Sequence, residues 1–195
     1  MPSLHVYLTE LKRSSLARKI PNISQENAEC IKNLIRERDA QHILEIGTAN
    51  GYSTLQFAWV LLASNAWSRE MRTITTIEYA KNAYGEAQIH FEKTRTDSLI
   101  TSLFGDAKSI LPTLPDEYFD FVFIDAMKRE YLDYLLLALS KMTPEALIVI
   151  DDVEKFRNKM EDLYTFLTEK NIPYSLLKTD PDDSIMVIHR KDIIL

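Results

Sequence analysis

Residues 42–58 read HILEIGTANGYSTLQFA, and three patterns meet within this stretch. The apolar run at residues 42–46 is typical of a short buried strand. The chain has only four glycines, and two of them, Gly47 and Gly51, follow this run within five positions. Apolar residues then recur at helical spacing, at Leu55, Ala58, Trp59 and Leu62. A strand, a glycine-bearing turn and a helix in this order predict the first unit of an α/β fold.

The same alternation continues on both sides of this stretch. Before it, apolar spacing predicts one helix over residues 4–11 and a second that begins after Ser24 as its N-cap. After it, strand-like runs alternate with helical stripes, the last of which extends from Phe156 to Leu167. The predicted strands of this part lie at residues 72–78, 98–106, 118–125 and 145–152.

Two further strands are predicted near the end of the chain, at residues 174–178 and 184–189. No helix separates them, so we expect them to pair antiparallel. Strands that alternate with helices favour a mainly parallel sheet covered on both faces. In such a sheet ligands bind outside the carboxyl ends of the strands.

Composition narrows the class of protein. The chain has 195 residues, of which 46% are hydrophobic and 27% charged, as in a folded globular domain. No apolar run is long enough to cross a bilayer, so we expect no membrane association. The net charge of −6 does not favour nucleic-acid backbones. A single cysteine, Cys30, allows no internal disulfide, and we expect a cytoplasmic protein.

Acidic residues follow most of the predicted strands. Any one of them is explained as an N-cap of the next helix. Together they place carboxylates along one edge of the sheet, where they repel each other unless cations or hydrogen-bond donors lie between them. These residues are Glu45, Glu78, Asp106, Asp125, Asp151 and Asp152.

The glycine-bearing turn and Glu78 suggest a nucleoside-containing ligand. Gly47 and Gly51 lack the Cβ that would keep a ligand from the main chain, and helix N–H groups lie beyond them. Ala49 occupies the middle position of a G-x-G-x-x-G pattern, which favours a small anion such as a carboxylate over a pyrophosphate. Glu78, one strand later, is placed to accept hydrogen bonds from a ribose diol.

A second cluster combines Asp125, Asp151 and Asp152 with Lys128. The three carboxylates come from neighbouring predicted strands and suit a hard ion such as Mg²⁺. A partly desolvated lysine near a dication can have its pKa lowered enough to act as a base, which is the role expected of Lys128. The alternative is that Lys128 and its neighbour Arg129 only solvate a helix surface.

The motifs LEIGTANGYST, ITTIEY, FGDA, FDFVFIDAMKREYLDYL and LIVIDDV follow one another in this order. This set resembles the cation-dependent O-methyltransferases, which include catechol and caffeoyl-CoA O-methyltransferases and a bacterial tRNA hydroxyuridine methyltransferase. The resemblance covers residues 20–189. It implies a Rossmann-like class I methyltransferase fold, with a seven-stranded, mostly parallel sheet, an antiparallel last strand and helices on both faces. It also implies S-adenosylmethionine (SAM) as the methyl donor.

The resemblance assigns a role to each matching residue. Glu45, Gly47, Gly51 and Ser53 lie in the motif that holds the methionine part of the donor. Glu78 matches the acid that binds the ribose hydroxyls and is followed by Tyr79. Asp106 and Ala107 lie beside the adenine, and Ile23 belongs to a loop that covers the donor. Asp125, Asp151 and Asp152 match the metal site, Asp125 also borders the donor, and Asp125 with Lys128 forms the catalytic pair.

Two features depart from the family pattern. The family usually has Asp-Asn where this chain has Asp151-Asp152, which adds a negative charge to the metal site. Many members also insert a loop before the last helix, whereas here the helix is expected to begin almost at once, and the N-terminal segment is short. The acceptor pocket is therefore expected to be open.

These observations lead to one principal hypothesis and three alternatives. The principal one is a single domain, with N-terminal helices over residues 1–40 that cover the site and a Rossmann-like core over residues 41–195. It transfers a methyl group from SAM to a hydroxyl of a catechol-like or other vicinal-oxygen acceptor, assisted by Mg²⁺. The alternatives are a tRNA methyltransferase, with Lys155, Arg157 and Lys159 as its basic surface, a nicotinamide-dependent oxidoreductase, and a non-catalytic nucleoside-binding module. The family resemblance also suggests a homodimer.

Overall fold

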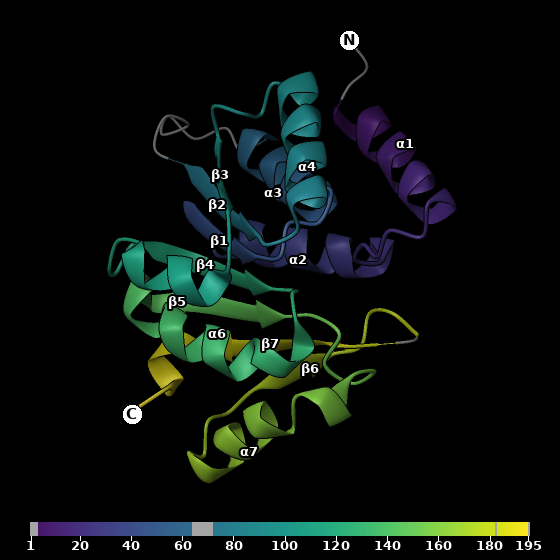
Figure 1. Ribbon diagram of the computed structural model, residues 1–195. Coiled ribbons are helices and arrows are strands. Elements are labelled where there is room, and N and C mark those ends of the chain that lie inside the picture. The colour runs from purple at the N-terminus through teal and green to yellow at the C-terminus, as the bar shows by residue number, and fades with distance from the viewer. Residues whose placement is uncertain (1–3, 64–71, 182, 195) are drawn as a thin grey trace.

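The computed structural model describes residues 4–63, 72–181 and 183–194, and its centre is one seven-stranded sheet (Figure 1). The strand order is β3-β2-β1-β4-β5-β7-β6. Strands β1 to β5 are parallel to one another, whereas β7 pairs antiparallel with both β5 and β6. The strands are β1 (His42–Ile46), β2 (Thr73–Glu78), β3 (Ile100–Phe104), β4 (Phe119–Ile124), β5 (Met142–Ile150), β6 (Ser175–Leu177) and β7 (Ile185–His189).

Helices cover both faces of this sheet. The α-helices are α1 (Leu4–Ala17), α2 (Gln25–Glu37), α3 (Tyr52–Ala63), α4 (Lys81–Thr94), α5 (Ala107–Ile110), α6 (Tyr131–Ala138) and α7 (Glu161–Glu169). Buried residues of α1 to α4 share one hydrophobic core, and those of α5 to α7 share the other. This is the class I methyltransferase arrangement that the sequence predicts. In the parts of the chain that the structure describes, no helix is both long and apolar enough to cross a membrane.

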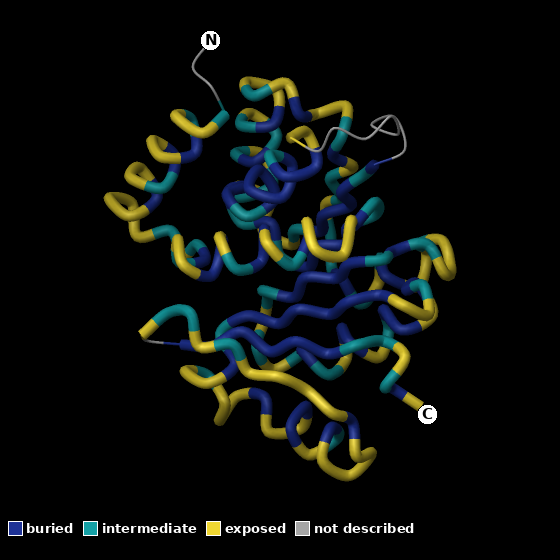
Figure 2. The backbone as a smooth tube through the Cα atoms, turned by 180° about the vertical axis from the view of Figure 1, so that it is seen from behind, coloured by how far each residue is buried: buried dark blue, intermediate teal, exposed yellow. Residues whose placement is uncertain are grey.

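The two cores follow from the alternation of side chains along the strands. In β4, Phe121 and Phe123 point to the core of α1 to α4, whereas Val122 and Ile124 point to that of α5 to α7. All four side chains are fully buried, as expected for a strand covered on both faces. In Figure 2 these inner strands run through the molecule as dark blue tubes, and the outward sides of the helices are yellow.

The strand order places the predicted acids on one edge. Strand β1 lies between β2 and β4. The chain passes from β1 to β2 on one side and later returns from β3 to β4 on the other side, and this change of direction opens a crevice at the carboxyl end of β1. Sheet hydrogen bonds continue past the strand ends: the N–H of Asp125 donates to Ile46 O (2.9 Å) and that of Asp151 to Ile124 O (3.1 Å). The acids that follow β4 and β5 are therefore held in register beside this crevice.

The last helix differs from its prediction. Helix α7 begins at Glu161, not near Phe156, and residues 152–160 form turns and a short 3₁₀-helix, Arg157–Lys159. The Asp183 carboxylate holds this segment, since its Oδ1 accepts the backbone N–H of Glu154 (2.9 Å) and of Lys155 (3.2 Å). These N–H groups are thereby tied to the loop before β7. A short segment therefore does separate β5 from the last helix.

Candidate active site

The two glycines of the turn after β1 are required by close packing. Gly47 has φ +98°, and a Cβ on it would lie 2.1 Å from the carbonyl oxygen of Asp125. Gly51 has φ +85°, and a Cβ there would lie 2.7 Å from the Phe91 ring of α4. Only Gly47 faces the ligand side of the turn. At Gly51 the missing Cβ allows α3 and α4 to approach each other, and Gly51 does not line the hollow described below.

Glu45 supports this turn from beneath. It is fully buried and accepts hydrogen bonds from three hydroxyl groups: Ser53 (2.5 Å), Thr54 and, from β2, Thr76 (2.6 Å). Desolvation raises the pKa of Glu45 to about 7, although the three hydroxyls act in the opposite direction. Glu45 and Ser53 thus join β1, α3 and β2 beneath the turn, and they do not border the hollow described below.

Glu78 closes the other side of the turn. Its Oε2 accepts the N–H groups of Ala49 (2.8 Å) and Thr48 (3.2 Å), and its Oε1 accepts that of Ala80 (2.7 Å). Ala49 adopts a left-handed conformation, with φ 46°, which turns its N–H toward this carboxylate. The acid predicted for a ribose therefore lies against the same turn that was predicted to receive an anion.

A hollow of about 560 Å³ opens at the carboxyl ends of β1, β2, β3 and β4. This volume is typical of a site for a nucleoside-sized ligand. It contains most of the predicted donor-binding residues, whereas Ile23, Glu45, Gly51 and Ser53 lie outside its lining. The predicted residues that border it are Gly47, Glu78, Tyr79, Asp106, Ala107 and Asp125.

Part of the lining was not predicted. Lys108 forms an ion pair with Glu130 (2.8 Å), and the hydroxyl of Tyr134 donates to the other oxygen of Glu130 (2.6 Å). The spacing of Glu130 and Tyr134, four residues apart at the start of α6, was the signal that could have placed them on one face. Met127, which is largely exposed, lies at the same edge, two residues after Asp125.

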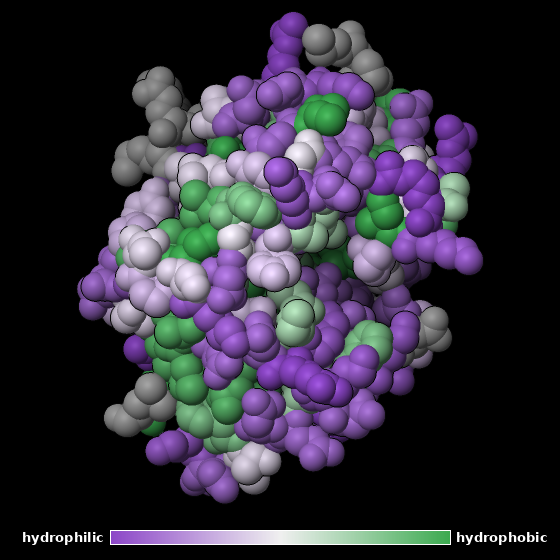
Figure 3. All heavy atoms as spheres, viewed as in Figure 1, coloured by the Kyte–Doolittle hydropathy of each residue, from purple (hydrophilic) through white to green (hydrophobic). Residues whose placement is uncertain are grey.

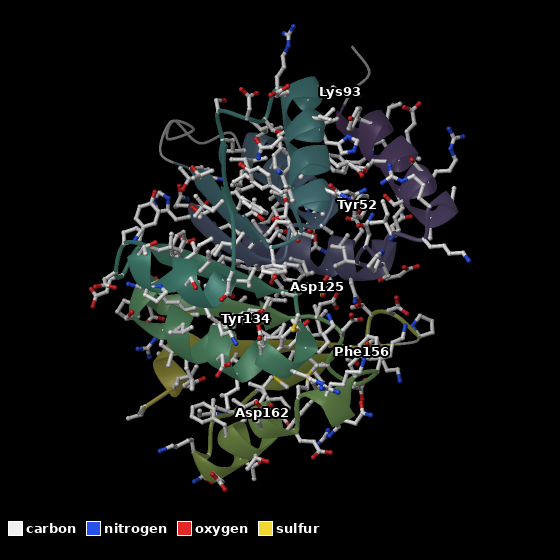
Figure 4. The ribbon with its side chains drawn as sticks, viewed as in Figure 1. Tyr52, Lys93, Asp125, Tyr134, Phe156 and Asp162 are labelled. Atoms are coloured by element: carbon white, nitrogen blue, oxygen red, sulfur yellow. The ribbon has the colours of Figure 1, made fainter. Side chains whose placement is uncertain are left out.

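The second cluster lies next to this hollow, since Asp125 belongs to both. The Lys128 ammonium lies 2.6 Å from Asp125 Oδ1 and 2.8 Å from Asp152 Oδ2, and it donates to the hydroxyl of Tyr131 (2.6 Å). We call Asp125, Lys128 and Asp152 the ion cluster. In Figure 4 Asp125 is labelled at the end of β4, near the middle of the molecule, with Tyr134 on α6 and Phe156 beyond β5.

The charge state of Lys128 differs from the expectation that its pKa is lowered enough for it to act as a base. Desolvation lowers its pKa, but Asp125 and Asp152 together outweigh desolvation, so that the pKa of Lys128 is raised. In this structure Lys128 is therefore an ammonium ion held by two carboxylates. It is not a free surface residue, because its side chain is only 14% exposed.

Asp151 has a different partner. It is buried, and its Oδ1 accepts a hydrogen bond from the amide Nδ2 of Asn27 (2.9 Å). The three aspartates were predicted to converge on one ion position, and in this structure they do not. In the ranges that the structure describes, no three Asp, Glu, His or Cys side chains are grouped as ligands of one metal. Asp125 and Asp152 converge on Lys128, and Asp151 faces Asn27.

Comparison with known proteins identifies the family. A family model described as O-methyltransferase matches residues 2–164. The chain belongs to this O-methyltransferase family. That membership removes the nicotinamide-dependent oxidoreductase from the alternatives, and it agrees with the resemblance that the ordered motifs carry.

Relatives and solved structures of this family extend the comparison. The chain is 33% identical over 135 residues (68% of its length) to a catechol O-methyltransferase of Niastella koreensis, and 29% identical over 152 residues (78%) to one of Mycobacterium tuberculosis. These matches span 58% and 65% of the two relatives. The O-methyltransferase TomG from Streptomyces achromogenes, solved in complex with SAM, has the same fold, with a TM-score of 0.79, 23% identity and coverage of 93% of this chain and 88% of its own.

Proposed function

We propose that this protein is a SAM-dependent O-methyltransferase that acts on a hydroxyl next to a second oxygen. The observation that carries the proposal is the shared position of Asp125, which borders the hollow and also holds Lys128 of the ion cluster. A donor in the hollow and an acceptor at the ion cluster would therefore meet at this residue. Two catechol O-methyltransferases among the relatives support an acceptor of this class.

The hollow supplies groups for each part of the donor. Glu78 would accept hydrogen bonds from the ribose hydroxyls through its carboxylate oxygens, which border the hollow. Asp106 and Ala107 would lie beside the adenine, and the turn at Gly47 would receive the methionine end. Glu45 and Ser53 would act from beneath, by holding the turn in place.

The reaction is an in-line displacement that needs a close and oriented nucleophile. The acceptor oxygen forms a bond to the methyl carbon while the carbon–sulfur bond breaks, and the donor leaves as S-adenosylhomocysteine. The hydroxyl proton passes to a carboxylate oxygen of the ion cluster, on Asp125 or Asp152, because Lys128 is already protonated. Lys128, held as an ammonium ion between two carboxylates, stabilises the negative charge that develops on the acceptor oxygen.

The predicted divalent cation does not fit this region as the structure describes it. Asp125 and Asp152 are paired with Lys128, and Asp151 faces Asn27, so no three Asp, Glu, His or Cys side chains of the described residues are grouped around one ion position. Burial, and then Asp125 and Asp152, raise the pKa of Asp151 well above its usual range, which favours the neutral form of this side chain.

The alternative of a tRNA acceptor receives less support from the predicted basic residues. The ammonium groups of Lys155 and Lys159 lie 5.7 and 4.7 Å from the centre of the Phe156 ring, and the guanidinium of Arg157 lies 3.9 Å from that of Tyr164. These cations therefore pack on rings of the protein itself. On the face shown in Figure 3, hydrophilic and hydrophobic side chains alternate in small groups.

A calorimetric titration with SAM, in Mg²⁺ and again in chelator, tests the donor site first. One-to-one binding in both buffers is expected, because Glu78 and the turn are built without the cation. Methyl transfer to catechol is then measured with and without Mg²⁺. Binding of SAM without transfer to catechol, caffeoyl thioesters or tRNA would favour the non-catalytic alternative, and absence of SAM binding by folded protein would overturn the proposal.

A further inference from the structure

The Lys128 ammonium lies among oxygen acceptors that the chain itself supplies. Two of them are carboxylate oxygens, Asp125 Oδ1 at 2.6 Å and Asp152 Oδ2 at 2.8 Å. The third is the hydroxyl of Tyr131, to which the ammonium donates at 2.6 Å. A lysine ammonium has three N–H donors, so these acceptors match its full donor capacity. The position of this positive charge is therefore fixed by the protein.

Aromatic rings also surround this ammonium. Its nitrogen lies 5.1 Å from the centre of the Tyr131 ring and 5.8 Å from that of the Phe156 ring. Rings at such distances attract a cation through their electron-rich faces. Tyr131 begins α6, whereas Phe156, labelled in Figure 4, belongs to the segment between β5 and α7. Elements that follow two different strands thus hold the same charge.

A divalent cation at this point would need the same carboxylates. Mg²⁺ binds carboxylate oxygens directly, and Asp125 and Asp152 already pair with the ammonium. A doubly charged ion beside these two carboxylates would also be repelled by Lys128. The pair of acids that the sequence assigns to Mg²⁺ therefore binds a cation that belongs to the chain.

The third predicted metal ligand is turned toward α2. Asp151 Oδ1 accepts a hydrogen bond from the amide of Asn27 at 2.9 Å, and both side chains are 3% exposed. The amide is fixed in turn, because the hydroxyl of Thr179 donates to Asn27 Oδ1 at 2.6 Å. Within the described ranges, Asp151 does not group with Asp125 and Asp152 around one ion position.

We propose that methyl transfer by this protein needs no divalent cation, because the Lys128 ammonium supplies the positive charge of the site. The inference rests on the proposed function, since it concerns the acceptor which that function assumes. The ammonium stabilises the negative charge that develops on the acceptor oxygen. Asp125 and Asp152 contact it through Oδ1 and Oδ2, respectively, and the second oxygen of each carboxylate can accept a hydroxyl group.

A titration with Mn²⁺, followed by electron paramagnetic resonance in the presence of S-adenosylhomocysteine, tests the inference without turnover. The wild type is expected to show no one-to-one binding. Lys128→Ala is expected to bind Mn²⁺ at least about tenfold more tightly than the wild type, because Asp125 and Asp152 lose their counter-charge. Lys128→Met, which removes the charge but keeps most of the side-chain volume, is expected to do the same and replaces the alanine variant if that unfolds.

Lys141→Ala is the matched control. This lysine is also buried and pairs with an aspartate, Asp116, at 2.6 Å, but it lies at the opposite edge of the sheet, just before β5. The variant is expected to match the wild type in Mn²⁺ binding and in kcat.

Methyl transfer to catechol by the wild type is then measured in chelator and in Mg²⁺. The two rates are expected to agree within about twofold, because no step uses a Lewis acid. Activity that is lost in chelator and restored by Mg²⁺ would overturn the inference, and so would a wild type that binds Mn²⁺ as tightly as the Lys128 variants do.

Failure of the proposed function has a different signature. A wild type that methylates catechol, caffeoyl thioesters and tRNA in neither buffer would remove that function. The Mn²⁺ titration would still decide the inference, because it compares wild type and variants without an acceptor.

Discussion

Glu45 is an acid whose charge depends strongly on its surroundings. Its carboxyl group is fully buried beneath the glycine-bearing turn, and its pKa is raised from 4.5 to about 7. Between these two values the folded protein binds more protons than the unfolded chain. The contribution of Glu45 to stability is therefore fully present below about pH 4.5 and is lost as the pH rises through about 7.

We expect Glu45→Gln to remove this part of the pH dependence. The shift corresponds to a change on the order of 3 kcal/mol in the free energy of unfolding. Urea unfolding of wild type and variant at pH 5 and pH 8 measures it: the wild type is expected to lose more stability at pH 8 than the variant. Equal losses in the two proteins would show that Glu45 is already ionised at pH 5.

Lys128 gives a prediction about catalysis. It contacts Asp125 and Asp152 but does not border the donor hollow. We expect Lys128→Ala to lower kcat by about 10²- to 10⁴-fold, the usual range for loss of a group that handles charge or protons in the transition state. The Kd for SAM, measured by calorimetry, is expected to change little. A large rise in that Kd would mean that Lys128 serves donor binding.

Substitution of Glu78, unlike that of Lys128, is expected to weaken the binding of SAM. Glu78→Gln leaves the size of the side chain unchanged but weakens the acceptor of the Thr48 and Ala49 N–H groups, which is also the proposed acceptor of the ribose hydroxyls. The Kd for SAM is expected to rise about tenfold, because a hydrogen bond to a charged group contributes about 1.5–3 kcal/mol. Calorimetry of both proteins measures this, and an unchanged Kd would contradict the assignment.

At the scale of elements, the turn after β1 leaves no room for a side chain at Gly47. A Cβ at Gly47 would overlap the backbone of Asp125, whereas a Cβ at Gly85, within α4, would meet nothing within 4 Å. We expect Gly47→Ala to lower the free energy of unfolding by at least about 2 kcal/mol. Gly85→Ala, the matched control, is expected to raise it by up to about 1 kcal/mol. Thermal unfolding of both variants measures the contrast, and a tolerated alanine at Gly47 would contradict it.

The sequence predicted the elements with the strongest periodicity. The strands at residues 42–46 and 119–124 are mostly apolar and lie where they were expected. The predicted start of the last helix was wrong, because Phe156 continues the apolar spacing of that helix without belonging to it. Asp183 instead accepts backbone N–H groups of the residues just before Phe156. A hydrogen bond between residues about 30 apart leaves no trace in local spacing.

At the scale of the whole molecule, the sequence was a better guide to the positions of the site residues than to their contacts within the site. Topology brings Glu78, Asp106 and Asp125 to one edge, so counting strands was enough to place them. Glu45 was assigned to the ligand but lies beneath the turn. Asn27 was missed because its contact with Asp151 depends on how α2 packs against the sheet, which no short motif records.

We propose that residues 1–195 fold as one cooperative unit. The hydroxyl of Tyr7 on α1 is 2.6 Å from His90 Nδ1 on α4, and Arg18, just after α1, pairs with Glu86 of α4 at 2.6 Å. Calorimetric unfolding is expected to show a single transition. Arg18→Ala is expected to move it by no more than a few degrees, because this pair is partly exposed. Two separate transitions would contradict a single unit.

The homodimer stays a prediction, which light scattering in solution tests.

The Glu78 carboxylate has a consequence for which nucleosides are admitted. It already receives three backbone N–H groups, at Thr48, Ala49 and Ala80. What it still offers a ligand is negative charge and lone pairs, which attract the hydroxyls of an unmodified sugar and repel a phosphate ester in the same place. We therefore expect the proposed donor site to discriminate between a sugar diol and a sugar phosphate before any ligand arrives.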